Sequence, residues 1–483
     1  MTLFFMLRLP SIIEPYWYGD EGIYQVIGQE MHQGKDLYKD IWDNKPPLLY
    51  VIYALANGDQ SVIRFVSLLF GVASVPFLYI LSRKLFPFRI ALATTGLYVF
   101  LFGSPILEGN IANAENFMQL PILGAAILIY TYITKTAEHH RQQSFTKYLF
   151  LHNKFLIAGL LLGIAFLFKI VAVFDLAAFV LFYAYLHLTK LSFKQIKGIV
   201  VQLLPLFLGF VFPIFLTFLY FASQGLLQPF MESAFVGNVD YVEYQNYLFG
   251  IPQGLLILKV ILLAAALFFV YRKRQKFSLT ALFVTLWMIC AVFSAFFSGR
   301  QYMHYTLVML PSFCLIFGLI LQIRKPSRRY TYVGILAVIC VLFHLYFVTW
   351  APKVIGYYQN VTEFLTGQRS LKAYQEFFDV KVPRDYAVAA FIKANTKPDD
   401  QVFIWGNNPQ IYVLANKLPP SRYAVAYHVK DNPIALEATQ KELDKVKPKY
   451  IIVLGESEPL PFRAPLYIML FNLDGATIYE RSF

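Results

Sequence analysis

The chain has few charged residues and few cysteines for its length. Only 15% of its 483 residues are charged, whereas ordinary globular chains contain about 25%. Hydrophobic residues make up 58% and the mean hydropathy is +0.52, so the polar surface is too small for a soluble protein. The three cysteines all lie inside apolar runs and lack metal-ligand spacing: Cys290, Cys314 and Cys340. This composition excludes a disulfide-stapled scaffold and indicates a polytopic membrane protein.

Apolar stretches of about 20 residues, the length that crosses a hydrocarbon core, recur along the chain. They predict ten spans, at 61–82, 88–106, 114–133, 155–171, 173–188, 199–222, 254–271, 277–297, 302–323 and 330–350. The opening MTLFFMLRLPSII is apolar but too short to span. It is typical of the end of a first helix whose beginning is missing, and it lacks the cleavage site of a signal peptide. We therefore expect a polytopic α-helical membrane protein with about 11 transmembrane helices, counting the truncated first one.

The net charge of +13 comes from Lys and Arg that gather in alternate connections between the spans. These connections are 83–89, 135–154, 190–197, 272–276 and 324–329. The positive-inside rule places them in the cytoplasm, and their distribution argues against a nucleic-acid partner. The segments then expected outside are 14–60, 107–113, 223–253, 298–301 and everything after 351. The predicted location is the cell membrane, as in a bacterial inner membrane, with the C-terminal part extracytoplasmic.

The last part of the chain, 352–483, has a different character from the apolar part, 1–351. Two of its segments have the spacing of helices, RDYAVAAFIKANT and IALEATQKELDKV. Three others resemble short buried strands, QVFIW, RYAVAY and KYIIVLG. We expect a small α/β domain on the outer face. It would cap the membrane part or bind the acceptor, and the cap is the simpler interpretation.

The predicted outer loop 14–60 contains an acidic pair, Asp20-Glu21. The pair stands at the start of a segment, 20–33, with apolar residues at helical spacing, which predicts an amphipathic helix in the membrane interface. Acids at this place can simply complement the helix dipole. Alternatively, one carboxylate serves as a base or a metal ligand.

Near the end of the same loop, Lys45 precedes two prolines in DNKPPLLY. Proline fixes its own φ and disfavours a helix at the residue before it. The prolines would hold Lys45 rigidly near the interface, where its ammonium could meet a lipid phosphate. The plainer interpretation is a turn before the next segment.

Two charged residues lie at the predicted outer ends of spans. Glu115 opens a span, where it could act only as a capping acid, and Lys169 lies near the end of another. Ionisable groups in spans are rare and usually functional, although snorkelling to the interface explains some. Asp175 is a candidate ion partner for Lys169.

Arg300 and His304 stand in SGRQYMHYTLVMLP, at the outer end of a predicted helix. A spacing of four residues would put both on one helix face. The planar guanidinium of Arg binds phosphate through two parallel hydrogen bonds. A lone His would more often be structural, but beside Arg300 it could donate to the same phosphate or bind a metal.

Together these motifs resemble the GT-C superfamily of glycosyltransferases. They are most similar to those of bacterial relatives of protein O-mannosyltransferases and of lipid A aminoarabinose transferases. The matching features are Asp20-Glu21 followed by Tyr24, KPPL at 45–48, Glu115, and the Arg-x-x-x-His-Tyr run at 300–305. One departure concerns metal binding. The aminoarabinose transferases have an acid just before KPPL, where this chain has Asn44.

The resemblance implies transfer of a sugar from a polyprenyl-phosphate donor to a lipid, glycan or protein acceptor on the outer face of the membrane. For that reaction we expect Asp20 to act as general base, with inversion at the sugar carbon, because a single in-line displacement needs only one carboxylate. Orientation of the acceptor or sugar falls to Glu21, Tyr24 and Glu115. Binding of the donor phosphate falls to Lys45, Lys169, Arg300, His304 and Tyr305. The sequence identifies no cofactor with certainty, and a divalent metal is left open.

Two other classes of protein compete with this interpretation. A transporter or lipid flippase without covalent chemistry would place charged groups near the middle of the membrane and use paired broken helices. The sequence shows no clear internal repeat, and its notable charges lie at outer ends of spans. A non-catalytic scaffold would explain the C-terminal part but not the concentration of special residues in loop 14–60.

Overall fold

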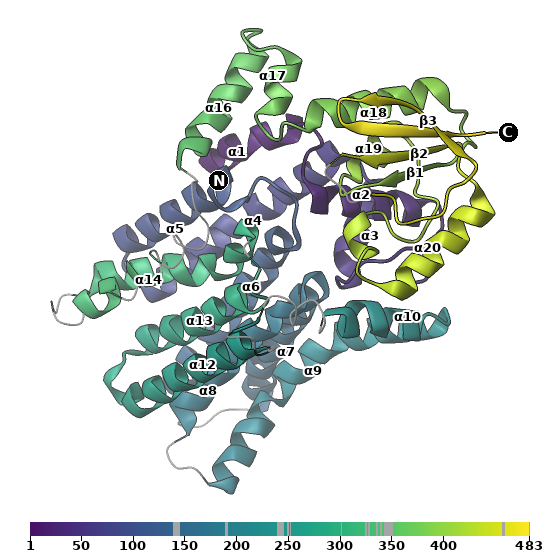
Figure 1. The fold of residues 1–483 in the computed structure, drawn as a ribbon. Helices are drawn as coiled ribbons and strands as arrows, with labels where there is room; N and C mark the ends of the chain where they lie inside the picture. Colours follow the sequence, from purple (N-terminus) through teal and green to yellow (C-terminus); the bar gives the residue numbers. More distant parts are fainter. Residues whose placement is uncertain are drawn as a thin grey trace. The chain divides into compact units, whose positions relative to one another are not determined.

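The computed structural model describes most of the chain as helices, together with one small sheet (Figure 1). The described residues are 1–138, 145–188, 192–238, 246–248, 251, 253–300, 302–323, 326, 329–334, 337–338, 341, 351–455 and 459–482. They divide into two compact units. The helical unit comprises Met1–Leu9, Val66–Gly225 and Val236–Val354. The α/β unit comprises Pro10–Phe65, Leu226–Phe235 and Ile355–Phe483.

The grouping places all of loop 14–60 in the α/β unit, together with the C-terminal part of the chain. From sequence, we assigned this loop to a membrane domain, 1–351, and only 352–483 to an α/β domain. The division into those two domains stays a prediction. What the contacts establish is that the loop packs with the C-terminal part.

The helical unit is built from long apolar helices. Their bounds are α1 Thr2–Arg8, α4 Gln60–Leu85, α5 Phe88–Gly103, α6 Ala114–Glu138, α7 Phe145–Phe168, α8 Val173–His187, α9 Phe193–Ser223, α12 Gly254–Lys273, α13 Leu279–Phe296 and α14 Leu310–Gln322, with α4 beginning in the α/β unit. Short turns of helix join some of them: η2 Pro105–Leu107, η3 Ile170–Ala172, η5 Arg274–Lys276 and η6 Met303–Met309. In the described part of the chain, seven helices are long and apolar enough to cross a membrane, and three are shorter and apolar. Nine of these helices coincide with predicted spans, and the other, Thr2–Ile13, lies where the truncated first helix was expected. The tenth predicted span, 330–350, lies largely outside the described residues.

Helices α7 and α9 are packed together unusually closely. A Cβ atom at Gly159 would lie 2.1 Å from the carbonyl oxygen of Leu206, and one at Gly209 would lie 2.1 Å from that of Leu156. Both distances are far below a van der Waals contact. Small residues allow helix backbones to approach in this way within membranes.

The α/β unit contains a four-stranded sheet, in the order β1-β2-β4-β3. The strands are β1 Val402–Trp405, β2 Tyr450–Leu454, β3 Tyr467–Leu473 and β4 Ala476–Arg481. Strands β1 and β2 are parallel, and the other two pairings are antiparallel. The parallel pair requires a crossover connection, which contains α19 Gln410–Ala415, η7 Ala426–His428 and α20 Pro433–Val446.

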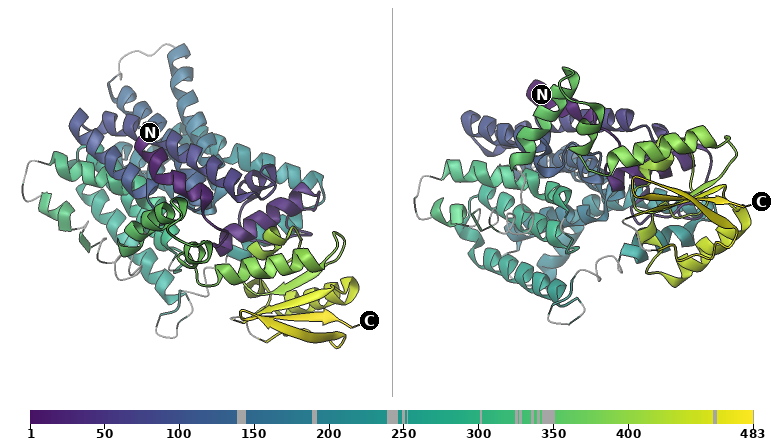
Figure 2. Two further views of the ribbon diagram at one scale, coloured as in Figure 1. Left: turned by 90° about the horizontal axis from the view of Figure 1, so that it is seen from above. Right: turned by 45° about the horizontal axis from the view of Figure 1, so that its top comes forward.

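Helices cover both faces of this sheet (Figures 1 and 2). On one face, α18 (Val382–Asn395) and α19 form a core with the strands that also includes Val26. On the other face, Ala435 and Leu443 of α20 pack with Phe403 and Ile451. The remaining elements of the unit are η1 Leu9–Ile13, α2 Gly19–His32, α3 Pro47–Leu55, α10 Leu227–Met231, η4 Glu232–Val236, α16 Ala351–Leu365 and α17 Leu371–Glu376. The expected fold class, a polytopic helical protein with a small α/β part, is confirmed.

Two predictions within this unit are wrong. The segment RYAVAY forms no strand, because Trp42 N donates to Arg422 O at 2.9 Å and the segment then turns into η7. The helix predicted at 20–33 exists as α2, but its apolar residues do not face lipid. Ile23, Val26 and Ile27 are at most 2% exposed, because α2 packs against α3 and α19.

Candidate active site

The two members of the acidic pair lie in different surroundings, although both stand in the first turn of α2. Glu21 is 1% exposed, and its carboxylate binds Arg64 through both oxygens, with the closest contact 2.5 Å from Nη2. Asp20 is partly exposed and accepts a hydrogen bond of 3.4 Å from the Tyr24 hydroxyl. Successive residues on a helix point about 100° apart, which explains why one carboxylate faces inward and its neighbour does not.

Arg64 is fully buried between two carboxylates. Besides Glu21, it contacts Glu14 Oε2 at 2.8 Å and donates to Ser11 O at 2.8 Å. Glu14 also accepts a hydrogen bond of 2.6 Å from the hydroxyl of Tyr357 in α16. Burial, together with the carboxylate of Glu14, raises the pKa of Tyr357 well above its usual value, so its hydroxyl keeps its proton. The network ties the first turn of α2 to the start of α4 and to α16.

Lys45 is held through its backbone on both sides. Its N–H donates to the Tyr50 hydroxyl at 3.2 Å, and its carbonyl accepts from the Tyr38 hydroxyl at 2.6 Å. The ammonium lies 3.6 Å from Asp43 Oδ2 and 4.8 Å from the centre of the Tyr24 ring. The side chain remains 22% exposed, so a rigid cation is presented beside Tyr24 and Asp43.

We call Asp20, Asp43, Lys45 and His428 the loop cluster. Sequence reasoning missed two of its members, Asp43 and His428. Burial alone would raise the pKa of Asp43, but Lys45 and a hydrogen bond from Tyr50 outweigh burial, so the pKa lies below its usual value. Burial lowers the pKa of His428 to about 4, against the opposing effect of Asp43, so the imidazole is neutral at physiological pH. Asp43 could have been noticed, since it directly precedes Asn44. No motif marks His428, which lies far away in sequence.

In the helical unit, Lys169 forms an ion pair with Glu115. Its ammonium also lies 3.9 Å from the centre of the Tyr305 ring. Glu115 is 1% exposed at the start of α6, and Lys169 lies between α7 and η3. The partner suggested from sequence, Asp175, is wrong, because its carboxylate accepts a hydrogen bond of 2.7 Å from the Trp287 indole N–H.

Arg300 and His304 do not share a helix face, contrary to the prediction. Helix α13 ends at Phe296 and η6 begins only at Met303, so Arg300 lies in the connection between them. Gly299 in this connection has a φ of +75°, which breaks the helix. His304 is 2% exposed, and its Nδ1 lies 3.0 Å from Glu108 Oε2.

Within the described residues, no group of three His, Cys, Asp or Glu side chains is arranged to hold a metal ion. Asp20, Asp43 and His428 in the loop cluster do not form such a group. The carboxylate of Glu21 is already engaged with Arg64. The residues present therefore do not fit a divalent metal at the acidic pair.

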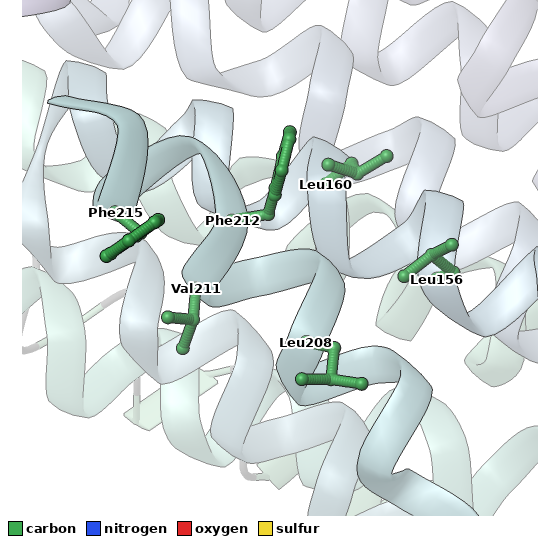
Figure 3. A pocket seen from close by; sticks show the side chains of 6 residues that line it. All are labelled: Leu156, Leu160, Leu208, Val211, Phe212 and Phe215. Atoms are coloured by element: carbon green, nitrogen blue, oxygen red, sulfur yellow. The ribbon is translucent and has the colours of Figure 1, made fainter. Parts of the chain in front are cut away.

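A cavity of about 390 Å³ lies between α7 and α9 (Figure 3). Its lining is entirely apolar and consists of Leu156, Leu160, Leu208, Val211, Phe212 and Phe215. None of the predicted site residues lines it. It offers no group for acid, base or phosphate chemistry.

Comparison with known proteins agrees with this architecture. Residues 45–220 match the model of the dolichyl-phosphate-mannose-protein mannosyltransferase family. This stretch includes Lys45, Glu115 and Lys169, but neither the acidic pair nor Arg300. No curated protein matches the chain.

Among solved structures, ArnT from Cupriavidus metallidurans, crystallised bound to undecaprenyl phosphate, is similar with a TM-score of 0.57 and 13% identity. The alignment covers 99% of this chain and 96% of that one. An oligosaccharyltransferase from Archaeoglobus fulgidus, tethered with an acceptor peptide, aligns with a TM-score of 0.45 and 13% identity, over 93% of this chain and 68% of that one. The likeness to ArnT shows that the chain has the GT-C fold that the sequence motifs predicted, and its apolar helices are those of a multi-pass membrane protein.

Proposed function

We propose that the protein is a membrane glycosyltransferase that moves a sugar from a polyprenyl-phosphate donor to an acceptor on the extracytoplasmic face. The observation that carries this proposal is the fold similarity to ArnT, which spans nearly all of both chains and whose structure holds undecaprenyl phosphate. The match of residues 45–220 to a mannosyltransferase family supports the same reaction class. Neither the fold similarity nor the family match identifies the sugar or the acceptor.

Asp20 is the general base of the proposed reaction. Glu21 is unsuited to this role, because Arg64 occupies both of its oxygens in a buried pair. Asp20 is partly exposed, with one long hydrogen bond from Tyr24. A carboxylate is a weak base, so it takes the proton of the acceptor hydroxyl late, as the new bond forms.

The reaction is a single in-line displacement. The acceptor oxygen bonds to the anomeric carbon, the bond from that carbon to the phosphate oxygen breaks, and the acceptor proton passes to Asp20. Polyprenyl phosphate leaves with the electron pair. One displacement inverts the sugar carbon, whereas retention would need a second, nucleophilic group.

Cations stabilise the departing phosphate, since the leaving group needs charge stabilisation more than a proton. The proposed cations are Lys45, Lys169, Arg300 and His304, and the hydroxyl of Tyr305 is proposed as a further phosphate-binding group. The contact of Lys169 with Glu115 and with the Tyr305 ring supports a fixed orientation for its ammonium. In this proposal Glu115 positions Lys169 through their ion pair. Glu21 fixes the first turn of α2 through Arg64, and Tyr24 orients Asp20 through its hydrogen bond.

Two isosteric variants of the acidic pair test the proposal. Asp20→Asn keeps the shape but removes the base, so we expect transfer from a polyprenyl-phosphate sugar to fall by at least about 100-fold, with the melting temperature unchanged. Glu21→Gln should instead lower the melting temperature, because it leaves Arg64 buried with an incomplete set of partners. Transfer is measured with the purified chain in lipid nanodiscs.

Near-normal transfer by a folded Asp20→Asn variant would rule out Asp20 as the base. If the wild-type chain transfers no sugar but moves the lipid across vesicles, the flippase alternative replaces the proposal.

A further inference from the structure

Two buried polar atoms in the loop cluster have unmet hydrogen-bonding capacity. The Asp43 side chain is 2% exposed, yet its Oδ2 accepts no hydrogen bond from any described residue and lies 3.6 Å from Lys45 Nζ. The Nδ1 atom of His428 is likewise buried without a hydrogen-bond partner among the described residues. Buried polar atoms in native proteins are usually paired with protein, water or ligand, and the hydroxyl groups of one ligand could pair with both of these neighbouring atoms.

The C-terminal part of the chain holds His428 beside the first turn of α2. His428 ends η7, which is fastened by a bond of 2.9 Å from Ala426 N to Gly406 O and by one of 3.1 Å from Tyr427 N to Asn407 Oδ1. A Cβ atom on Gly19, the residue before Asp20, would lie 3.5 Å from Asn407 O. The same short segment therefore contacts the turn that carries the base and positions the imidazole.

Aromatic rings border the imidazole of His428. The ring of Trp42 lies 4.7 Å away and that of Tyr427 4.4 Å away, measured between ring centres. Tyr427 is 44% exposed, and His428 itself is partly exposed. Exposed aromatic faces beside a few fixed polar atoms suit a ligand that is apolar on one side and polar on the other, and a sugar ring has this character.

The charge of the cluster argues against a phosphate on Asp43 and His428. Asp43 has a pKa below its usual value and carries negative charge, its neighbour Lys45 carries positive charge, and His428 is neutral with a pKa of about 4. Neutral hydroxyl groups can donate to a carboxylate oxygen, and they can pair with an imidazole nitrogen in either tautomer. The fitting ligand is therefore neutral and rich in hydroxyl groups.

We propose that Asp43 and His428 form a subsite for the sugar of the donor, with His428 as a specificity-determining residue. This proposal rests on the proposed function. In that function Lys45 binds the donor phosphate, and the sugar is bonded directly to that phosphate. With Asp43 3.6 Å from the ammonium of Lys45, the sugar is the part of the donor within reach of Asp43 and His428.

The test compares binding of undecaprenyl phosphate with and without a sugar. The full-length chain in nanodiscs is titrated with plain undecaprenyl phosphate and with its mannose, glucose and N-acetylglucosamine esters. His428→Phe keeps a ring against Trp42 but removes the nitrogen atoms, and Asp43→Asn removes the charge. We expect each to weaken the preferred sugar-bearing donor by roughly tenfold, the value of one good hydrogen bond, and His428→Phe to change binding of plain lipid phosphate less than twofold.

Three further variants serve as controls. His428→Gln retains a hydrogen-bonding group and should recover part of the affinity. Arg300→Ala should weaken the plain and sugar-bearing lipids alike, since the proposed function assigns it to the phosphate. Lys441→Ala, on the exposed face of α20, should change neither.

The possible outcomes distinguish failure of the proposed sugar subsite from failure of the proposed function. Equal loss of both lipids in His428→Phe, or no loss, overturns the subsite and leaves the function standing. A wild-type chain that binds no sugar-bearing lipid more tightly than the plain lipid also overturns the subsite alone. A wild-type chain that binds neither overturns both.

Discussion

Single residues in the α/β unit show how much a side chain's environment decides its chemistry. Asp20 and Glu21 are adjacent acids on one helical turn, yet only Glu21 is buried against Arg64. The sequence pattern predicted that Asp20 acts as base and that Glu21 supports it. The pairing of Glu21 with Arg64, which explains this difference, could not be predicted. Arg64 lies in a predicted span 43 positions after Glu21, and local sequence patterns do not indicate such distant contacts.

Glu30 provides a test at the residue scale. It is 1% exposed near the end of α2, and burial raises its pKa to about 7 against the opposing effect of Lys35. Between the ordinary pKa of 4.5 and about 7, the folded chain keeps this proton while the unfolded chain releases it. Stability should therefore decrease as the pH rises through this window and level off above it, a change on the order of 3 kcal/mol.

Glu30→Gln should remove that slope, because the amide does not titrate. The measurement is the melting temperature of the solubilised chain between about pH 5 and pH 8. Glu437→Gln, on the exposed surface of α20, is the matched control and should leave the slope unchanged. If the melting temperatures of the wild type and of Glu30→Gln change with pH in parallel, the prediction is wrong.

At the scale of elements, the local pattern located helices well and strands less well. Helices α18 and α20, with β1 and β2, lie where their sequence pattern placed them. The hairpin of β3 and β4 was missed, although Asp474-Gly475 occupies its turn with φ angles of +50° and +92°, a strong hairpin signal. RYAVAY alternates as a strand would, but its backbone pairs with Trp42 instead of a strand.

The glycine contacts between α7 and α9 give a prediction for these elements. Gly159→Ala would place a methyl group 2.1 Å from Leu206 O, so the helices must separate. We expect a destabilisation of about 1–3 kcal/mol, seen as a lower melting temperature of the solubilised chain. Gly198→Ala, in the partner helix α9, has no atom within 4 Å of its Cβ position and should be neutral or slightly stabilising. Equal melting temperatures for the two variants would contradict the close packing.

For the whole molecule, the charge pattern predicts which side of the membrane each connection faces, and chemical labelling can test this. In a background with all three cysteines changed to alanine, Lys441→Cys and Lys276→Cys each place one exposed thiol. The positive-inside rule puts Lys276 in the cytoplasm and Lys441 outside. An impermeant maleimide should therefore label position 441 in spheroplasts and position 276 only after permeabilisation. The opposite pattern would overturn the proposed outer-face reaction.

The sequence by itself determined the properties that depend on local composition and spacing. These are the apolar spans, the acidic pair at the start of a helix, the lysine before two prolines and the membrane class. Only the tertiary structure decided which side chains meet. It paired Glu21 with Arg64, replaced Asp175 by Glu115 as the partner of Lys169, and brought His428 to Asp43. The physical reason is that these contacts join residues far apart in the chain, where periodicity and propensity carry no information about distance.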